Sequence, residues 1–195
     1  MTNLRFITHL DVLAVQAQFY RLLNPVDAKK SKVRWMTDER MPHKTMLLRV
    51  QKDAKQENWL DDLPLYDEPE YETWKSLRKL LANAKKAIFN DPMLRDLVDP
   101  TAAPGRIVIS VLNPDSIMMP HHDLGEYAKR HLRFHLALQT NPACLLYCKL
   151  EQMHLPVGGL AFLNALDTHW AVNWGTSPRA HVIFELRRRD APDAE

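Results

Sequence analysis

Polar and apolar side chains alternate along short segments in the second half of the chain, a period of two that is typical of β-strands. Between residues 132 and 138 every second side chain is apolar, and Arg133 and His135 occupy the positions between them. Residues 179–186 repeat this alternation, with Arg179 on the polar side. Each segment therefore turns an apolar face to one side and ionisable groups to the other.

Further short strands are indicated by a β-branched run at residues 106–112 and by residues 160–164, which follow a Gly-Gly turn. All five glycines lie after residue 104, where tight turns between strands favour them. Many short strands at regular spacing predict a sandwich or a barrel. A small double-sheet jelly roll with its site inside the barrel agrees with this pattern.

The first hundred residues contain no glycine and carry helical as well as strand-like patterns. Apolar residues recur at helical spacing over residues 10–20 and 71–89. A strand is predicted at residues 44–50, and the polar stretch at residues 51–70 is predicted to be a surface loop. The predicted fold is mainly β with flanking helices, in which a double-stranded β-helix core follows an N-terminal α/β extension.

One structural domain is expected from 195 residues and 22.7 kDa. We divide it into an N-terminal mixed part at residues 1–104, a jelly-roll core at residues 105–190 and a short tail at residues 191–195. The hydrophobic content of 46% is enough for a sizeable core.

Charge and hydropathy argue against two classes of partner. A net charge of +2 gives no field that would attract nucleic acid or an anionic membrane. No apolar run reaches the roughly 18 residues that a membrane helix needs, and the first residues lack a signal-peptide pattern. Cys144 and Cys148 match no zinc or redox pattern, so we expect buried thiols in a cytoplasmic protein.

A candidate metal site begins at His121 and Asp123, which leave the same face of an extended strand because they are two residues apart. The distant His169 completes two imidazoles and one carboxylate, the ligand set of the facial triad in non-haem Fe(II) oxygenases. His122 is an alternative ligand, although it would point away from Asp123. Arg179 follows His169 by ten residues, where a guanidinium could hold the far carboxylate of a 2-oxoacid bidentately.

Polar side chains that face the interior of a barrel are costly to bury unless they bind something. One buried histidine is more often a satisfied core residue than a ligand, but many polar groups directed at one cavity predict a site. The predicted inward set comprises Ser110, His121, Asp123, Arg133, His135, His169, Arg179 and His181. For Arg133 and His135, a structural ion pair with a neighbouring strand is the alternative. For Arg179, the alternative is a surface position on an edge strand.

Several landmarks follow one another in a fixed order along residues 106–187. They are Ile-Ser110-Val-Leu, Pro120-His121-His122-Asp123, Leu-Arg133-Phe-His135-Leu-Ala-Leu, Thr140-Asn141-Pro142, Gly159 before a Phe-containing strand, His169-Trp-Ala-Val-Asn173 and Pro178-Arg179-Ala-His181. In order and spacing the chain resembles the aspartyl/asparaginyl β-hydroxylase family, which also contains bacterial cis-proline hydroxylases. Vertebrate-type members lack a carboxylate at the position of Asp123, so the resemblance is nearer to the bacterial branch. The first hundred residues match only loosely.

The resemblance implies a jelly-roll dioxygenase that uses Fe(II), 2-oxoglutarate and O2. It implies three iron ligands, which are His121, Asp123 and His169. Arg179 and Ser110 would hold the distal carboxylate of 2-oxoglutarate. His135, together with Arg133, would lie near the iron-proximal carboxylate and the substrate.

The implied reaction is hydroxylation of an amino-acid unit, either an Asp or Asn residue in a peptide or a free amino acid such as proline. A free amino acid needs a clamp for its carboxylate, and Arg133 or Arg49 could serve. A non-catalytic jelly-roll protein that binds and senses a metal or a small ligand is the alternative. A third hypothesis is hydroxylation of a sugar or a lipid headgroup. The sequence leaves the oligomeric state open.

Overall fold

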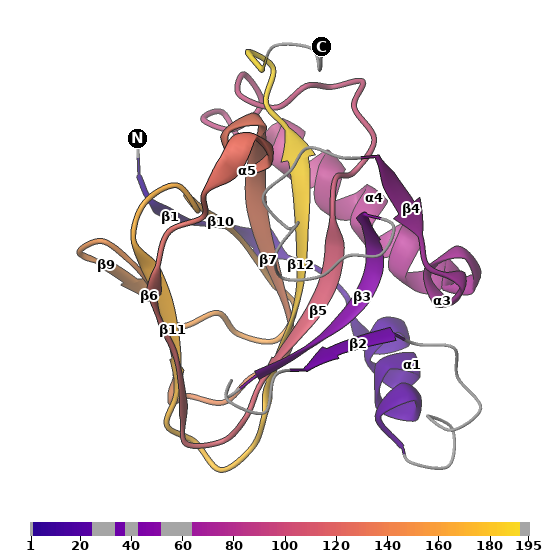
Figure 1. Ribbon diagram of the computed structural model, residues 1–195, viewed down its shortest axis with the longest axis vertical. Coiled ribbons are helices and arrows are strands. Elements are labelled where there is room, and N and C mark those ends of the chain that lie inside the picture. Colours follow the sequence, from indigo (N-terminus) through magenta and orange to yellow (C-terminus); the bar gives the residue numbers. More distant parts are fainter. Residues whose placement is uncertain (1, 25–33, 38–42, 52–63, 192–195) are drawn as a thin grey trace.

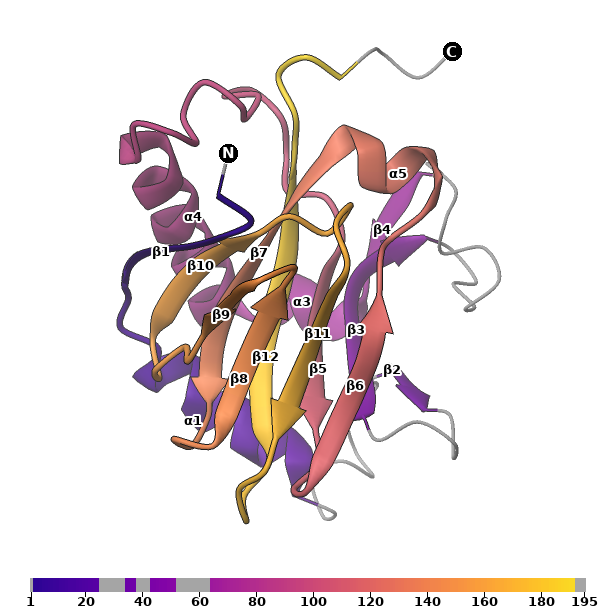
Figure 2. The same ribbon diagram turned by 90° about the vertical axis from the view of Figure 1, so that its left-hand side faces the viewer.

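Two antiparallel β-sheets face each other, and helices cover the outer side of the larger sheet (Figures 1 and 2). The computed structural model describes residues 2–24, 34–37, 43–51 and 64–191. Within them, strands from both halves of the chain build the larger sheet, whereas the smaller sheet is built from the second half. This arrangement confirms the predicted fold class, a jelly-roll core with flanking helices.

The larger sheet has eight strands and the smaller sheet has four. The hydrogen-bonded order of the larger sheet is β1 (Leu4–His9), β10 (Gly159–Leu163), β7 (His131–Gln139), β12 (Arg179–Arg187), β5 (Ile107–Leu112), β3 (His43–Gln51) and β2 (Arg34–Thr37), with β4 (Leu65–Asp67) also paired to β3. The order of the smaller sheet is β6 (Ser116–His121), β11 (His169–Asn173), β8 (Cys144–Cys148) and β9 (Glu151–Met153).

The alternation along β7 and β12 decides which layer each side chain enters. Phe134 and Val182, on the apolar faces, are fully buried in the main core beneath the helices. On the opposite face of β7, Ala137 packs in a second core with Leu146 of the smaller sheet. His135 shares the face of Ala137, so the predicted polar set is directed into the space between the two sheets.

The outer layer consists of α1 (Leu13–Leu23), α3 (Pro69–Thr73) and α4 (Lys75–Asn90), whereas α5 (Gly125–Arg130) links β6 to β7 at one end of the barrel (Figure 1). The predicted helix at residues 71–89 is divided in two. Trp74, which is fully buried, interrupts it with φ −80° and ψ 73°. The apolar stripe of α4 is nevertheless buried as expected, at Leu77, Leu81, Ala84 and Ile88.

Two other boundaries in the N-terminal part differ from the prediction. The helix expected at residues 10–20 begins three residues later, because Leu10 donates its N–H to the carbonyl of Gly158 at 2.8 Å and stays extended. The loop expected at residues 51–70 contains β4 and the start of α3, and β4 forms because β3 offers it hydrogen-bond partners. Residues 52–63 of that loop lie outside the described part of the chain.

The N-terminal part supplies strands to the larger sheet as well as helices to its outer face. β1 pairs with β10, and β3, which contains the strand predicted at residues 44–50, pairs with β5. In that ladder Thr45 lies opposite Ser110. One continuous sheet therefore crosses the boundary drawn at residue 104, and the interior between the sheets has an N-terminal wall. The expected tail at residues 191–195 is described only at its first residue.

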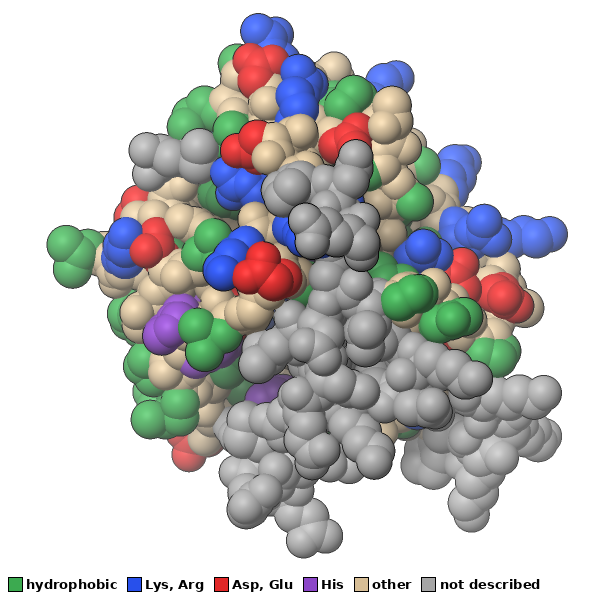
Figure 3. All heavy atoms as spheres, turned by 45° about the horizontal axis from the view of Figure 1, so that its top comes forward, with side chains coloured by type: hydrophobic (Ala, Val, Ile, Leu, Met, Phe, Trp, Pro, Cys, Tyr) green, Lys and Arg blue, Asp and Glu red, His purple; other side chains and the backbone are tan. Residues whose placement is uncertain are grey.

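Side chains of both charges lie interspersed over the described part of the face shown in Figure 3. No helix within the described ranges has the length and hydropathy needed to cross a bilayer. Cys144 and Cys148 are both buried and unpaired, as expected. Burial raises the pKa of the Cys148 thiol to about 11, so this thiol is not a nucleophile at neutral pH.

Candidate metal centre and anion pocket

Two strands of the smaller sheet bring the predicted histidines together. His121 is the last residue of β6, His169 is the first residue of β11, and the two are paired in the antiparallel ladder with ring centroids 4.3 Å apart. Asp123 follows β6 and is held in place by its main-chain N–H, which donates to the carbonyl of Ala165 at 2.8 Å. The potential ligand atoms of His121, Asp123 and His169 all lie within 4.8 Å of one another.

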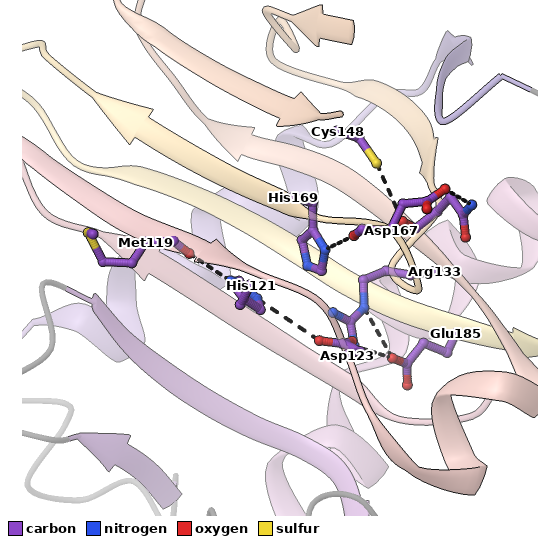
Figure 4. A network of polar contacts seen from close by, with 9 residues as sticks. Met119, His121, Asp123, Arg133, Cys148, Asp167, His169 and Glu185 are labelled. Atoms are coloured by element: carbon purple, nitrogen blue, oxygen red, sulfur yellow. Dashed lines mark hydrogen bonds and ion pairs between the residues drawn. The ribbon is translucent and has the colours of Figure 1, made fainter. Parts of the chain in front are cut away.

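Main-chain carbonyls fix the orientation of both imidazoles (Figure 4). His121 Nδ1 donates to the carbonyl of Met119 at 2.8 Å, and His169 Nδ1 donates to the carbonyl of Asp167 at 2.9 Å. A carbonyl only accepts, so each Nδ1 carries the proton and each Nε2 keeps a lone pair for a metal. His121 Nε2 lies 4.0 Å from Asp123 Oδ1, which leaves room for an ion between them.

The electrostatics of the cluster suit a divalent cation. Burial is the main cause that lowers the pKa of His169, to about 4, so this imidazole is neutral at physiological pH. Burial alone would raise the pKa of Asp123, but the charge of Arg133 and the two neighbouring imidazoles lower it below its usual value. The neutral imidazole of His169, the ionised carboxylate of Asp123 and the Nε2 atom of His121 form a ligand set of the kind that a non-haem iron requires. His122, the alternative ligand, is exposed and does not join the cluster.

Arg133 is ion-paired on both sides. Its Nη2 lies 2.5 Å from Asp123 Oδ2 and 2.7 Å from Glu185 Oε1. Burial opposes the charged form, but the two carboxylates raise the pKa of Arg133, which therefore stays protonated. The alternative considered for this residue, an ion pair with a neighbouring strand, is thus present in the structure. Contact between Arg133 and a substrate stays a prediction.

A second arginine has no carboxylate partner among the described residues. Arg179, at the start of β12, is 2% exposed, and its Nη1 has no hydrogen-bond partner among the described residues. Its Nε donates to His181 Nε2 at 3.2 Å, and its Nη2 lies 2.9 Å from His181 Nδ1. Burial lowers the pKa of Arg179 to about 10, so the guanidinium is still charged at neutral pH. Because an unpaired buried charge is costly in free energy, a buried guanidinium of this kind favours binding of an anionic ligand.

In the same interior, a hydroxyl also lacks a partner within the described part of the chain. Ser110 on β5 lies opposite His181 of β12, and its Oγ is buried without a hydrogen bond in the described part of the chain. His135 lies 3.4 Å from His181 between their Nδ1 atoms. The structure therefore gathers Ser110, His135, Arg179 and His181 on one wall, as the alternation predicted. Arg179 Nη1 and Ser110 Oγ, which have no hydrogen-bond partner among the described residues, are suitable donors for a carboxylate.

The N-terminal wall contributes a residue that the sequence analysis missed. His43 begins β3, and its Nδ1 is buried without a hydrogen-bond partner among the described residues. Burial lowers the pKa of His43, and the nearby charges of Arg179 and His121 lower it further. His43 therefore lies near both the anion pocket and the metal cluster. Its sequence signal is the alternation that runs back from Thr45 to His43, because the strand predicted at residues 44–50 begins one residue too late.

A small pocket opens beside the metal cluster, with a volume of about 120 Å³. Its lining consists of Arg106, His122, Asp123, Leu124, Tyr127, Ala128 and Arg133. The guanidinium of Arg106 lies 3.5 Å from the centroid of the Tyr127 ring, a cation–π contact that forms one wall. Because Asp123 borders both the pocket and the cluster, a small molecule bound here would lie next to the metal.

Relatives of known activity match part of the chain. The L-proline cis-4-hydroxylase of Rhizobium meliloti (strain 1021) is 27% identical over 83 residues, which cover 43% of this chain and 30% of that protein. The matched region is thus less than a third of the relative's length.

Solved structures share the fold over a larger part of the chain. A 2OG-Fe(II) oxygenase family oxidoreductase from Burkholderia pseudomallei has a TM-score of 0.57 at 13% identity, with 85% of this chain and 77% of that chain covered. A Pseudomonas putida prolyl-4-hydroxylase has a TM-score of 0.53 at 14% identity, with 96% and 93% covered. At these identities the likeness shows the fold.

The family model named aspartyl/asparaginyl beta-hydroxylase matches residues 50–189. This range includes the whole metal cluster, the residues of the anion pocket on β5, β7 and β12, and the lining of the open pocket. The resemblance inferred from the sequence is confirmed, and the chain belongs to the aspartyl/asparaginyl β-hydroxylase family.

Proposed function

We propose that this protein is an Fe(II)- and 2-oxoglutarate-dependent dioxygenase that hydroxylates an amino-acid unit. The observation that carries the proposal is the buried guanidinium of Arg179, which has no carboxylate partner among the described residues and lies in the same interior as the His121–Asp123–His169 cluster. A metal site alone would suit many proteins. A metal site that shares its interior with a buried guanidinium supports a metal-chelating dicarboxylate as co-substrate.

Each group of residues has a role in this proposal. His121, Asp123 and His169 hold the iron on one face. Arg179 and Ser110 bind the distal carboxylate of 2-oxoglutarate, and the neutral ring of His135 orients the end that approaches the metal. When bound, iron supplies the oxidising chemistry in which 2-oxoglutarate, O2 and a substrate C–H bond give succinate, CO2 and a hydroxylated product. The protein positions the reactants and keeps water out.

The open pocket beside Asp123 supports a small substrate. Arg49, one of the two carboxylate clamps considered from the sequence, is paired with Asp67 at 2.5 Å and does not line this pocket. Arg106 and Arg133 do line it, so a substrate carboxylate would meet two guanidinium groups there. We propose a free amino acid as the substrate, with L-proline as the first candidate because a relative is named for it.

The test is anaerobic reconstitution with Fe(II) and 2-oxoglutarate, followed by addition of O2. The expected result is a visible charge-transfer band from the chelate, which is absent in Arg179→Ala and His169→Ala, and succinate formation after O2 is added. L-proline should raise succinate yield, whereas L-prolinamide, which lacks the carboxylate, should not. An iron-loaded protein that shows no band would overturn the proposal, and binding of 2-oxoglutarate without succinate would favour a sensing protein.

A further inference from the structure

The two oxygens of Asp123 have different partners (Figure 4). Oδ1 faces His121 Nε2 at 4.0 Å, on the side where a metal would lie. Oδ2 lies 2.5 Å from Arg133 Nη2. A carboxylate whose second oxygen is held by a guanidinium has one oxygen left for a metal.

Arg133 is itself held by a second carboxylate, that of Glu185. Arg133 Nε and Nη2 both donate to Glu185 Oε1, at 3.2 Å and 2.7 Å. The two residues face each other directly in the β7–β12 ladder. Asp123, by contrast, lies in the segment that follows β6. The larger sheet, through this cross-strand pair, therefore fixes the guanidinium that contacts Asp123, the candidate ligand that lies outside a strand.

Glu185 lies in a buried environment. It is 5% exposed, and the neighbouring Tyr127 is almost completely buried. The Tyr127 hydroxyl accepts the main-chain N–H of Arg106 at 2.7 Å, and burial followed by the charge of Glu185 raises the pKa of that hydroxyl well above its usual value. Glu185 therefore stays next to a neutral phenol and cannot easily move away from Arg133.

The charges explain why a second carboxylate is useful here. A divalent cation at the cluster would place two positive charges beside the guanidinium of Arg133. If Asp123 were the sole counter-ion of Arg133, the guanidinium and the metal would compete for one negative charge. Glu185 supplies the second negative charge, so that Arg133 can orient Oδ2 of Asp123 without weakening Oδ1 as a ligand.

We propose that Glu185 is a positioning residue of the metal centre, which acts through Arg133 to hold Asp123 as a one-oxygen ligand. This inference rests on the metal site of the proposed function. It gives Arg133 a role in the metal centre in addition to any contact with a substrate.

The experiment uses Co(II) as the probe, with its visible absorption as the readout, so that no enzymatic turnover is required. Glu185→Gln keeps the size of the side chain and removes the charge. The dissociation constant of Co(II) should rise about 10- to 100-fold, the usual cost of losing an outer-shell partner of a metal ligand. Glu126→Gln is the matched control, because Glu126 is an exposed acid on α5 whose partner is Lys129. It should bind Co(II) like the wild type.

A double variant separates positioning from general stability. In an Arg133→Met background the added Glu185→Gln change should not weaken Co(II) binding further, because the residue through which Glu185 acts is already absent. Equal Co(II) affinity in wild type and in folded Glu185→Gln would overturn the inference, as would full additivity in the double variant. If Glu185→Gln does not fold, Glu185→Asp, which keeps the charge but shortens the side chain that reaches Arg133, must weaken Co(II) binding as well. Failure of the wild type to bind Co(II) would instead count against the metal site itself.

Discussion

The imidazole rings of His135 and His181 meet edge to face across β7 and β12, with centroids 5.7 Å apart and an interplanar angle of 80°. The guanidinium of Arg179 contacts the imidazole of His181. Burial first, and the charge of Arg179 second, lower the pKa of both imidazoles well below the usual value. The wall behind the anion pocket is therefore built from two rings that must be neutral in the folded protein.

The stability of the ligand-free protein should fall as the pH is lowered below about 6.5, the ordinary histidine pKa in an unfolded chain. The folded pKa values of His135 and His181 are lowered, so the unfolded state binds more protons, and stability present above pH 6.5 is lost as the pH falls. Each ring contributes a slope of up to about 1.4 kcal/mol per pH unit. Urea unfolding between pH 8 and pH 5 measures it.

Two variants test whether His181 causes that pH dependence of stability. His181→Gln should reduce the slope because one buried imidazole no longer titrates, whereas His9→Gln, at an exposed position, should leave the slope unchanged. Equal slopes in His181→Gln and the wild type would mean that His181 is not held neutral in the fold.

Arg179→Met should stabilise the ligand-free protein while abolishing its response to 2-oxoglutarate. The guanidinium is buried without a carboxylate among the described residues, so its replacement by an apolar side chain of similar length removes an uncompensated charge. The gain should be about 1–3 kcal/mol. The measurements are urea unfolding without ligand and the shift in Tm on adding 2-oxoglutarate.

The same substitution at Arg49 is the control and should have the opposite sign. Arg49 is paired with Asp67, so Arg49→Met leaves a carboxylate without its partner and should destabilise the protein. It should leave the 2-oxoglutarate response intact. Destabilisation by Arg179→Met as well would show that Arg179 is a structural residue.

Ser110→Ala should weaken 2-oxoglutarate binding with little effect on folding. The Ser110 hydroxyl makes no hydrogen bond within the described residues, so its removal should change the free energy of unfolding by less than about 0.5 kcal/mol. Loss of one hydrogen bond to the co-substrate should raise its dissociation constant roughly 3- to 10-fold. Isothermal titration of the metal-loaded protein tests this, with Ser116→Ala, whose hydroxyl bonds to the carbonyl of Pro114, as the control.

The inward-facing polar set could be predicted because β7 and β12 carry an uninterrupted period of two. Their apolar positions are buried under the helices, which forces Arg133 and Arg179 to the other side. Glu185 lies on that same face, but its contact with Arg133 depends on how β7 and β12 pair. This pairing register joins distant segments, so it cannot be read from either segment alone.

The strands of the smaller sheet were harder to predict. β6 contains Pro120 and two methionines and has little β-propensity of its own; it forms a strand because β11 pairs with it. His43 lies just outside the strand predicted at residues 44–50, because the start of β3 is defined by its pairing with β5. Strand boundaries that depend on a distant partner could not be predicted, although the candidate metal ligands were identified from their spacing and chemistry.

Asp123→Asn should remove metal binding and leave the protein folded. The amide lacks the charge of the carboxylate, so Co(II) affinity should fall by more than the roughly 100-fold that marks the upper end of outer-shell effects. Arg133 keeps its pair with Glu185, and the Asn oxygen can still accept a hydrogen bond from Nη2. The free energy of unfolding should therefore fall by only about 1–2 kcal/mol.

Asp167→Asn is the matched control. The Asp167 side chain pairs with Lys149, but His169 is oriented by its main-chain carbonyl, so metal affinity should stay within about twofold of wild type. A folded Asp123→Asn protein that binds Co(II) normally would show that another group completes the site.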